Sequence, residues 1–157
     1  MAVQTSYSTT HAKAYAGMVA DQQLKNTTSV LNKDVVAIPY GKGVVRGGLL
    51  PTSGSTAASF VGVAMRELNR AYADGDTFGI PVGRDGTALT AGVIWVKAAN
   101  DTIVAGETVH LRVGATNTGD FSNAVGSAGT LSVALNGKFL TGGDTGDLVQ
   151  ISLVIGG

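Results

Sequence analysis

The chain has 157 residues, the size of one domain, and 44% of them are hydrophobic, enough for a core that needs neither disulfides nor metals. Its 11 basic and 11 acidic residues cancel, and no run of Lys or Arg reaches three, so we expect no nucleic-acid partner and no anionic-membrane patch. Cysteine is absent, which fits a reducing compartment, and no stretch approaches 18 apolar residues, so we expect no membrane span.

Glycine is unusually frequent in this chain and charge is scarce. It holds 23 glycines and 14% charged residues, roughly twice and half of the average shares. Many turns and few Glu, Lys and Arg favour short strands over helices. Low charge also suggests that partner proteins cover much of the surface; the alternative is a β domain that is simply neutral.

Residues 1–30 differ from the rest of the chain. They are polar and rich in Ser, Thr and Gln, with Ala14, Tyr15, Met18 and Val19 as the candidates for burial. We predict an extended N-terminal arm over residues 1–30 and a β-rich body over residues 31–157. A short helix around residues 12–23 is the alternative. No charged region followed by an apolar run opens the chain, so we expect no signal peptide.

Short apolar runs separated by turn signals begin at Val35. Residues 35–39, the turn 40–43 and residues 44–46 together predict a hairpin. Another strand is expected over residues 60–66. Residues 67–76 have poor apolar spacing and are predicted to form a loop.

The clearest strand is predicted for residues 87–97, which include Trp95. Residues 108–113 alternate between apolar and polar side chains, so one face of this strand is expected to be buried. Residues 114–129 are rich in Gly, Asn and Ser, which predicts a long loop.

The C-terminal part contains the strongest turn signal. The dipeptide Asn136-Gly137 is typical of tight hairpin turns, so we predict a strand on either side of it. Residues 148–155 are mostly apolar and predict a final strand buried on both faces. Strands thus recur about every 10 to 15 residues, which predicts an all-β sandwich, jelly-roll or barrel-like body.

Residues that carry catalytic or metal chemistry are few. The chain has no Cys, so a Cys nucleophile is excluded. His11 and His110 are its only histidines, so few residues are available for a catalytic triad or a zinc site. The glycine-rich residues 41–48 match neither phosphate-loop pattern. The acidic turn 142–147 lacks the ligand spacing of calcium loops. We therefore predict no catalytic residue, no cofactor and no metal site, and hence no enzyme.

Six segments occur in a characteristic order along nearly the whole chain. They are MAVQTSYSTTHAKAYAGMVAD, AIPYGKGVVRGG, FVGVAMRE, LTAGVIWVKAA, IVAGETVHLR and ALNGKFLTGGDTGDLVQISL. This series resembles the structural cement, or head-decoration, proteins of tailed bacteriophages. The resemblance implies a virion structural protein that bridges major capsid subunits on the outer surface of the head, assembled in the host cytoplasm.

The resemblance implies two kinds of partner. One is the major capsid protein, and the other is the protein itself, as a homotrimer or homodimer at a capsid symmetry axis. We expect capsid contacts to concentrate in the arm, and secondarily at the tip of the predicted hairpin and in the loop after residues 60–66. The candidate residues are Val3, Tyr7, Tyr15, Met18, Tyr40, Lys42, Arg66, Asn69 and Arg70.

Two alternatives remain open. Another virion module, such as a tail or fibre component, is poorly separated from a capsid protein by sequence. A small trimeric β enzyme of the dUTPase type matches in size and β content. That enzyme needs a tyrosine-bearing, glycine-flanked nucleotide motif with a nearby catalytic Asp, and the sequence does not contain it.

Overall fold

A computed structural model describes residues 12–21, 24–72, 76–100 and 102–154. Regular structure in these ranges is β-strand apart from two 3-10 turns, η1 (Ala57–Ser59) and η2 (Ala128–Thr130). Neither of these turns approaches the length and apolarity that crossing a bilayer requires. The predicted all-β class is confirmed.

The strands follow one another at short intervals along the chain. In the described ranges they are β1 (Asn26–Leu31), β2 (Ile38–Pro39), β3 (Gly43–Val45), β4 (Phe60–Ala64), β5 (Gly79–Ile80), β6 (Asp85–Lys97), β7 (Thr108–Arg112), β8 (Phe121–Ser122), β9 (Ser132–Phe139) and β10 (Leu148–Leu153).

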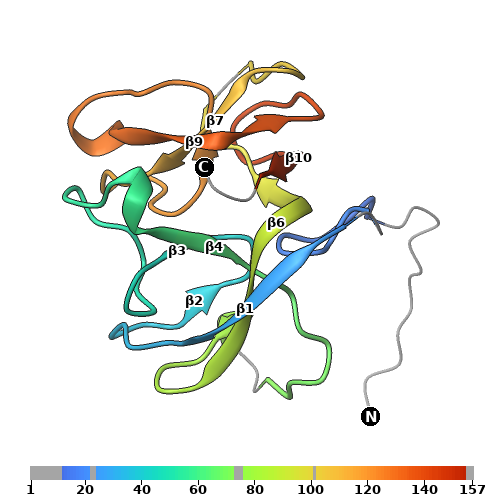
Figure 1. Ribbon diagram of the computed structural model, residues 1–157, viewed down its shortest axis with the longest axis vertical. Helices are drawn as coiled ribbons and strands as arrows, with labels where there is room; N and C mark the ends of the chain where they lie inside the picture. Colours follow the sequence, from blue (N-terminus) through green and yellow to red (C-terminus); the bar gives the residue numbers. More distant parts are fainter. Residues whose placement is uncertain (1–11, 22–23, 73–75, 101, 155–157) are drawn as a thin grey trace, which may run out of the picture.

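Strand β6 organises the fold, because it runs from the β1–β2 end of the molecule to the end that holds β7, β9 and β10 (Figure 1). Its first half lies between β1 and β4, with Leu89 opposite both Thr27 and Val63. Its second half pairs with β10. The strand exchanges these neighbours at Gly92, whose φ of 125° is a conformation that side-chain-bearing residues rarely adopt.

The main sheet nearly closes into a barrel. Its order is β3-β4-β6-β10-β9-β7-β8, and β1 lies on the other side of β6. The two ends of this series meet, because the Gly43 N–H donates to the Gly119 carbonyl at 2.8 Å just before β8. The Ala99 N–H also donates to the Phe121 carbonyl at 2.7 Å, which ties β8 to the end of β6. These contacts confirm the barrel-like body.

Two hydrophobic cores lie on opposite faces of β3, β4 and β6. Successive side chains of a strand point to opposite faces, so Val44 and Val45 enter different cores, as do Ala88 and Leu89. The larger core fills the barrel and includes Val63, Leu89, Ile94, Leu111, Phe121, Phe139 and Ile151. The smaller core includes Val30, Ile38, Tyr40, Val44, Ala64, Ile80 and Ala88, and the short β2–β5 sheet contributes to it.

Part of the predicted arm lies on the body. Gly17 N–H donates to the Trp95 carbonyl at 2.8 Å, Trp95 N–H donates to the Met18 carbonyl at 2.9 Å, and Val19 forms a bridge with Ile94. This short stretch extends the sheet along β6. The predicted boundary between residues 30 and 31 falls inside β1, and residues 1–11 lie outside the described residues.

The hairpin predicted for residues 35–46 is wrong. β2 pairs with β5, whereas β3 pairs with β4, so the turn between β2 and β3 connects two different sheets. Val35 and Val36 precede β2 and are 90% and 50% exposed. An apolar run closed by proline and glycine does not specify which strand it will pair with.

The hairpin turn predicted at Asn136-Gly137 is also wrong, because both residues lie within β9. The final strand, β10, alternates between buried Val149 and Ile151 and partly exposed neighbours, so it is not buried on both faces.

Candidate functional site

The residues predicted to contact a partner fall into three groups: those outside the described residues, those engaged within the chain, and those at or near the surface. Val3 and Tyr7 lie outside the described residues. Tyr40, Lys42 and Arg70 are engaged in contacts within the chain, which the next three paragraphs describe.

Tyr40 is buried, with 6% of its surface exposed. Its hydroxyl lies 2.5 Å from that of Tyr72, and the Tyr72 hydroxyl donates to the Gly79 carbonyl at 3.0 Å. Tyr40 is therefore the donor within the pair. Burial, reinforced by this hydrogen bond, raises the pKa of Tyr40 well above its usual value, so the hydroxyl stays protonated. The pair fastens the segment after β4 to β5.

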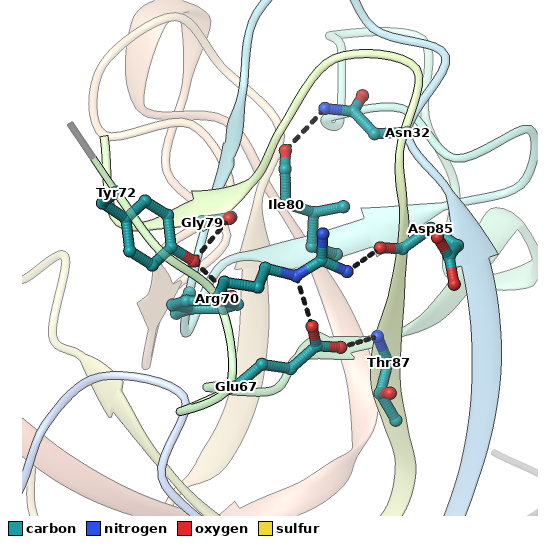
Figure 2. A network of polar contacts seen from close by, with 9 residues as sticks. Asn32, Glu67, Arg70, Tyr72, Gly79, Ile80, Asp85 and Thr87 are labelled. Atoms are coloured by element: carbon teal, nitrogen blue, oxygen red, sulfur yellow. Dashed lines mark hydrogen bonds and ion pairs between the residues drawn. The ribbon is translucent and has the colours of Figure 1, made fainter. Parts of the chain in front are cut away.

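Glu67 and Arg70 fasten the same segment to β6 (Figure 2). Glu67 accepts a hydrogen bond from Arg70 Nε at 2.5 Å and another from the Thr87 N–H at 3.0 Å. Arg70 also donates to the Asp85 carbonyl. The hydrogen bond to Glu67 raises the pKa of Arg70. Both charged groups of this pair are thus used inside the chain.

Lys42 closes the barrel where β3 approaches β8. Its Nζ lies 2.8 Å from Asp120 Oδ1 and donates to the Thr118 carbonyl at 2.9 Å. The two charged side chains are only 19% and 11% exposed. Burial raises the pKa of Asp120, and the Lys42 charge opposes that shift. Lys42 therefore acts as a structural cation rather than as a free surface group.

Arg66 and Tyr15 are brought together at the surface. The Arg66 N–H donates to the Gly17 carbonyl at 2.8 Å, which places the segment around Tyr15 beside the start of the segment that follows β4. The Arg66 guanidinium carbon lies 4.4 Å from the centroid of the Tyr15 ring and 6.0 Å from that of Phe78. These two rings are 52% and 60% exposed. Asn69 is exposed nearby in the chain, and Met18 is half-buried.

An exposed apolar surface continues from these rings. Phe78 packs on Tyr72, with ring centroids 5.0 Å apart. A shallow hollow of about 340 Å³ adjoins these rings and is lined by Ala37, Tyr72, Asp76, Thr77, Pro81 and Val82. Val35 and Val36 directly precede Ala37 in the chain. We call Tyr15, Arg66, Phe78, Val82, Val36 and Val35 the exposed docking surface.

Sequence analysis missed Val35, Val36, Phe78 and Val82. The first two belong to an apolar run that reads as a buried strand, and the other two lie beside β5, a strand of only two residues. In the described ranges, no group of three or more His, Cys, Asp or Glu side chains is placed to hold a metal ion. The side chains of the exposed docking surface are apolar, aromatic and cationic, and Asp76 and Thr77 add polar groups at the adjoining hollow. Aromatic residues and arginine are enriched at protein interfaces.

The fold as a whole occurs in a virus capsid. Among solved structures, the chain is similar to a chain in the capsid of Myoviridae phage XM1, with a TM-score of 0.73 and 17% identity over 99% of both chains. No significant match to a curated protein is found.

The sequence also matches the model of a protein family over residues 3–154. That family is the structural cement proteins (E217 gp24/Pam3 gp6), and the chain belongs to it. The resemblance predicted from the ordered segments is confirmed, and the protein is a structural component that decorates a bacteriophage capsid.

Proposed function

We propose that the protein binds the outer surface of the assembled head and bridges neighbouring subunits of the major capsid protein. The family match over residues 3–154 carries this proposal, and the exposed docking surface supports it. A ligand that binds only the assembled shell stabilises that shell by mass action. Contacts to several subunits reinforce one another through effective concentration, so bridging stabilises more than isolated binding would.

Self-association and location are part of the same proposal. The protein acts as a homotrimer or homodimer at a capsid symmetry axis, is added to heads in the host cytoplasm, and has no catalytic role. The balance of 11 basic and 11 acidic residues and the low share of charge support a surface that becomes covered on assembly.

Co-sedimentation tests the binding directly. Purified protein is mixed with expanded, cement-free shells of the phage that encodes it, and with unexpanded precursor shells as a control. We expect saturable pelleting with expanded shells. Protein that stays in the supernatant at every concentration contradicts the proposed function.

The contribution of the arm is tested by removing residues 1–11, which leaves the contacts of Gly17 and Met18 with Trp95 intact. We expect weaker co-sedimentation of the truncated protein. If the truncated protein binds the shells as tightly as the full chain does, residues 1–11 do not contribute to capsid binding.

Location and activity need separate measurements. An electron-microscopy map of the virion should show the barrel outside the shell at a symmetry axis, and density on the inner surface contradicts this. Incubation with nucleoside triphosphates and magnesium should give no turnover. Robust hydrolysis would instead favour the dUTPase-type alternative.

A further inference from the structure

Arg66 differs from the other arginines that bind neighbouring groups. Arg70 donates to Glu67 and to the Asp85 carbonyl, and buried Arg112 donates to the Thr130 and Ala99 carbonyls. Arg66 instead contacts the exposed rings of Tyr15 and Phe78. Among the described residues, its guanidinium forms no hydrogen bond and no ion pair.

The nearest acidic residue in the sequence does not neutralise Arg66. Both oxygens of Glu67 are used, one by Arg70 and the other by the Thr87 N–H. The carboxylate of Glu67 is therefore fully used by its own neighbours, and the positive charge of the partly exposed Arg66 lies beside two exposed rings. This arrangement is complementary to a negative group on a partner.

The ring contacts order the guanidinium without using its donors. An aromatic ring attracts the cation through its face, whereas the five N–H donors of arginine lie in the guanidinium plane. The backbone bond from Arg66 to Gly17 fixes the start of the side chain. Less side-chain entropy remains to be lost on binding, and the planar fork is free to take a carboxylate with two parallel hydrogen bonds.

We propose that Arg66, held between Tyr15 and Phe78, binds a carboxylate of the major capsid protein when the protein docks on the shell. This inference rests on the proposed function and names the chemistry of the contact. The flanking rings exclude water from the ion pair, and arginine with aromatic neighbours is the composition typical of interface hot spots. Val82 and Val36 extend the apolar area around it.

Substitutions at Arg66 test the contact in the shell-binding assay. Arg66→Gln keeps a long polar side chain but removes the charge, and Arg66→Lys keeps the charge but removes the planar fork. Arg46 is an exposed arginine next to β3, so Arg46→Gln is the matched control for charge. We expect Arg66→Gln to weaken binding about tenfold or more. Arg66→Lys should recover only part of the loss, and Arg46→Gln should bind like the wild type.

Three further measurements support the comparison. The thermal unfolding of Arg66→Gln should stay close to that of the wild type, because the guanidinium forms no hydrogen bond or ion pair among the described residues and contacts only exposed rings. Raising the salt concentration should weaken wild-type binding more than that of Arg66→Gln, because one screened ion pair is missing in the variant. Tyr15→Ala and Phe78→Ala should each weaken binding although Arg66 is retained.

The outcomes separate this inference from the proposed function. Failure of the wild-type protein to bind expanded shells overturns both. If the wild type binds and Arg66→Gln binds as tightly as Arg46→Gln, the Arg66 contact alone is overturned. Loss of self-association by Arg66→Gln in analytical ultracentrifugation, with unchanged binding per protomer, would assign the site to a second copy of the chain and overturn the inference. Full affinity of Arg66→Lys overturns the two-bond geometry.

Discussion

Lys42 and Asp120 form an ion pair that is largely removed from water. Breaking such a pair from one side leaves a charge without its partner in a poorly solvated place. We expect Lys42→Met to lower the free energy of unfolding by about 2–4 kcal/mol at pH 7. Lys42→Met combined with Asp120→Asn should be less destabilised than Lys42→Met alone, because the stranded carboxylate is gone. Urea denaturation of the three proteins measures both effects, and additive losses would contradict the pairing.

The same pair predicts how stability depends on pH. Burial raises the pKa of Asp120, so the folded protein holds this proton more tightly than the unfolded chain does. The contribution of Asp120 to stability is therefore fully present below the ordinary carboxyl pKa and is lost as pH rises through the folded pKa. Removing Lys42 raises that pKa further. We expect the deficit of Lys42→Met to be small near pH 4 and to grow toward pH 7, and a deficit independent of pH would count against this account.

The hydroxyls of Tyr40 and Tyr72 make unequal contributions. Tyr40→Phe removes one donor and leaves the bond from Tyr72 to the Gly79 carbonyl in place. Tyr72→Phe removes that bond and also strands the buried hydroxyl of Tyr40. We expect losses of about 1 kcal/mol for Tyr40→Phe and of about 2–3 kcal/mol for Tyr72→Phe. Equal losses in chemical denaturation would show that the hydroxyl chain does not run in this direction.

At the scale of the elements, the turn after β3 is held against the end of β1. Gly48 has a φ of 72°, and its carbonyl accepts the Lys33 N–H at 2.9 Å. A Cβ at this position would lie 1.8 Å from the carbonyl oxygen of Leu31, a backbone atom that cannot move alone.

Gly48→Ala should therefore cost about 3 kcal/mol or more, from both the backbone conformation and the clash with β1. The matched control is Gly54→Ala, because a Cβ there meets no atom within 4 Å. Hydrogen exchange should show faster exchange along β1 in Gly48→Ala and no change in Gly54→Ala. A Gly48→Ala protein as stable as the wild type would contradict this packing.

Strand β9 shows why a strong local signal can be overridden. Asn136-Gly137 favours a tight turn, but β10 pairs with this part of β9, with Leu153 opposite Gly137, and β7 pairs along its other edge. The role of Gly137 is close approach, since a Cβ would lie 2.6 Å from the Ser152 carbonyl oxygen. The alternation of apolar and polar residues correctly predicted strand on both sides of Asn136-Gly137. Pairing with β7 and β10, which are distant in the sequence, makes the two parts a single continuous strand.

The docking surface was predictable only in part. Tyr15 could be named as a candidate because it is an apolar anchor in the polar arm, and Arg66 because it lies where the predicted strand over residues 60–66 gives way to a loop. That Arg66 lies over Tyr15 and beside Phe78 depends on the backbone hydrogen bond between Arg66 and Gly17. Contacts between distant parts of the chain also explain why Tyr40 and Lys42 were misplaced. The local pattern predicts both at the tip of a hairpin, but in the fold they pack against Tyr72 and Asp120, respectively.

At the scale of the whole molecule, both described cores are built around one long strand. β6 carries Ala88 into the smaller core and Leu89, Ile94 and Val96 into the larger one. Both ends of the molecule therefore hold a packed core, and the exposed docking surface lies beside the smaller one, next to β2 and β5. A body packed around two cores can bind a preformed shell with little reorganisation, which lowers the free-energy cost of binding.

The last prediction concerns the particle that this molecule joins. If each protomer binds only the expanded shell, free protein at about 100 times its Kd stabilises each site by about 2.7 kcal/mol, and the gain grows with the logarithm of concentration. The temperature at which expanded shells come apart, followed by calorimetry, should rise with added protein and keep rising slowly after the sites are filled. Arg66→Gln should need a higher concentration for the same rise, in proportion to its weaker affinity. If the protein pellets with the shells but leaves their disassembly temperature unchanged, it binds intact shells and dissociated subunits equally well. Cementing would then have no thermodynamic basis.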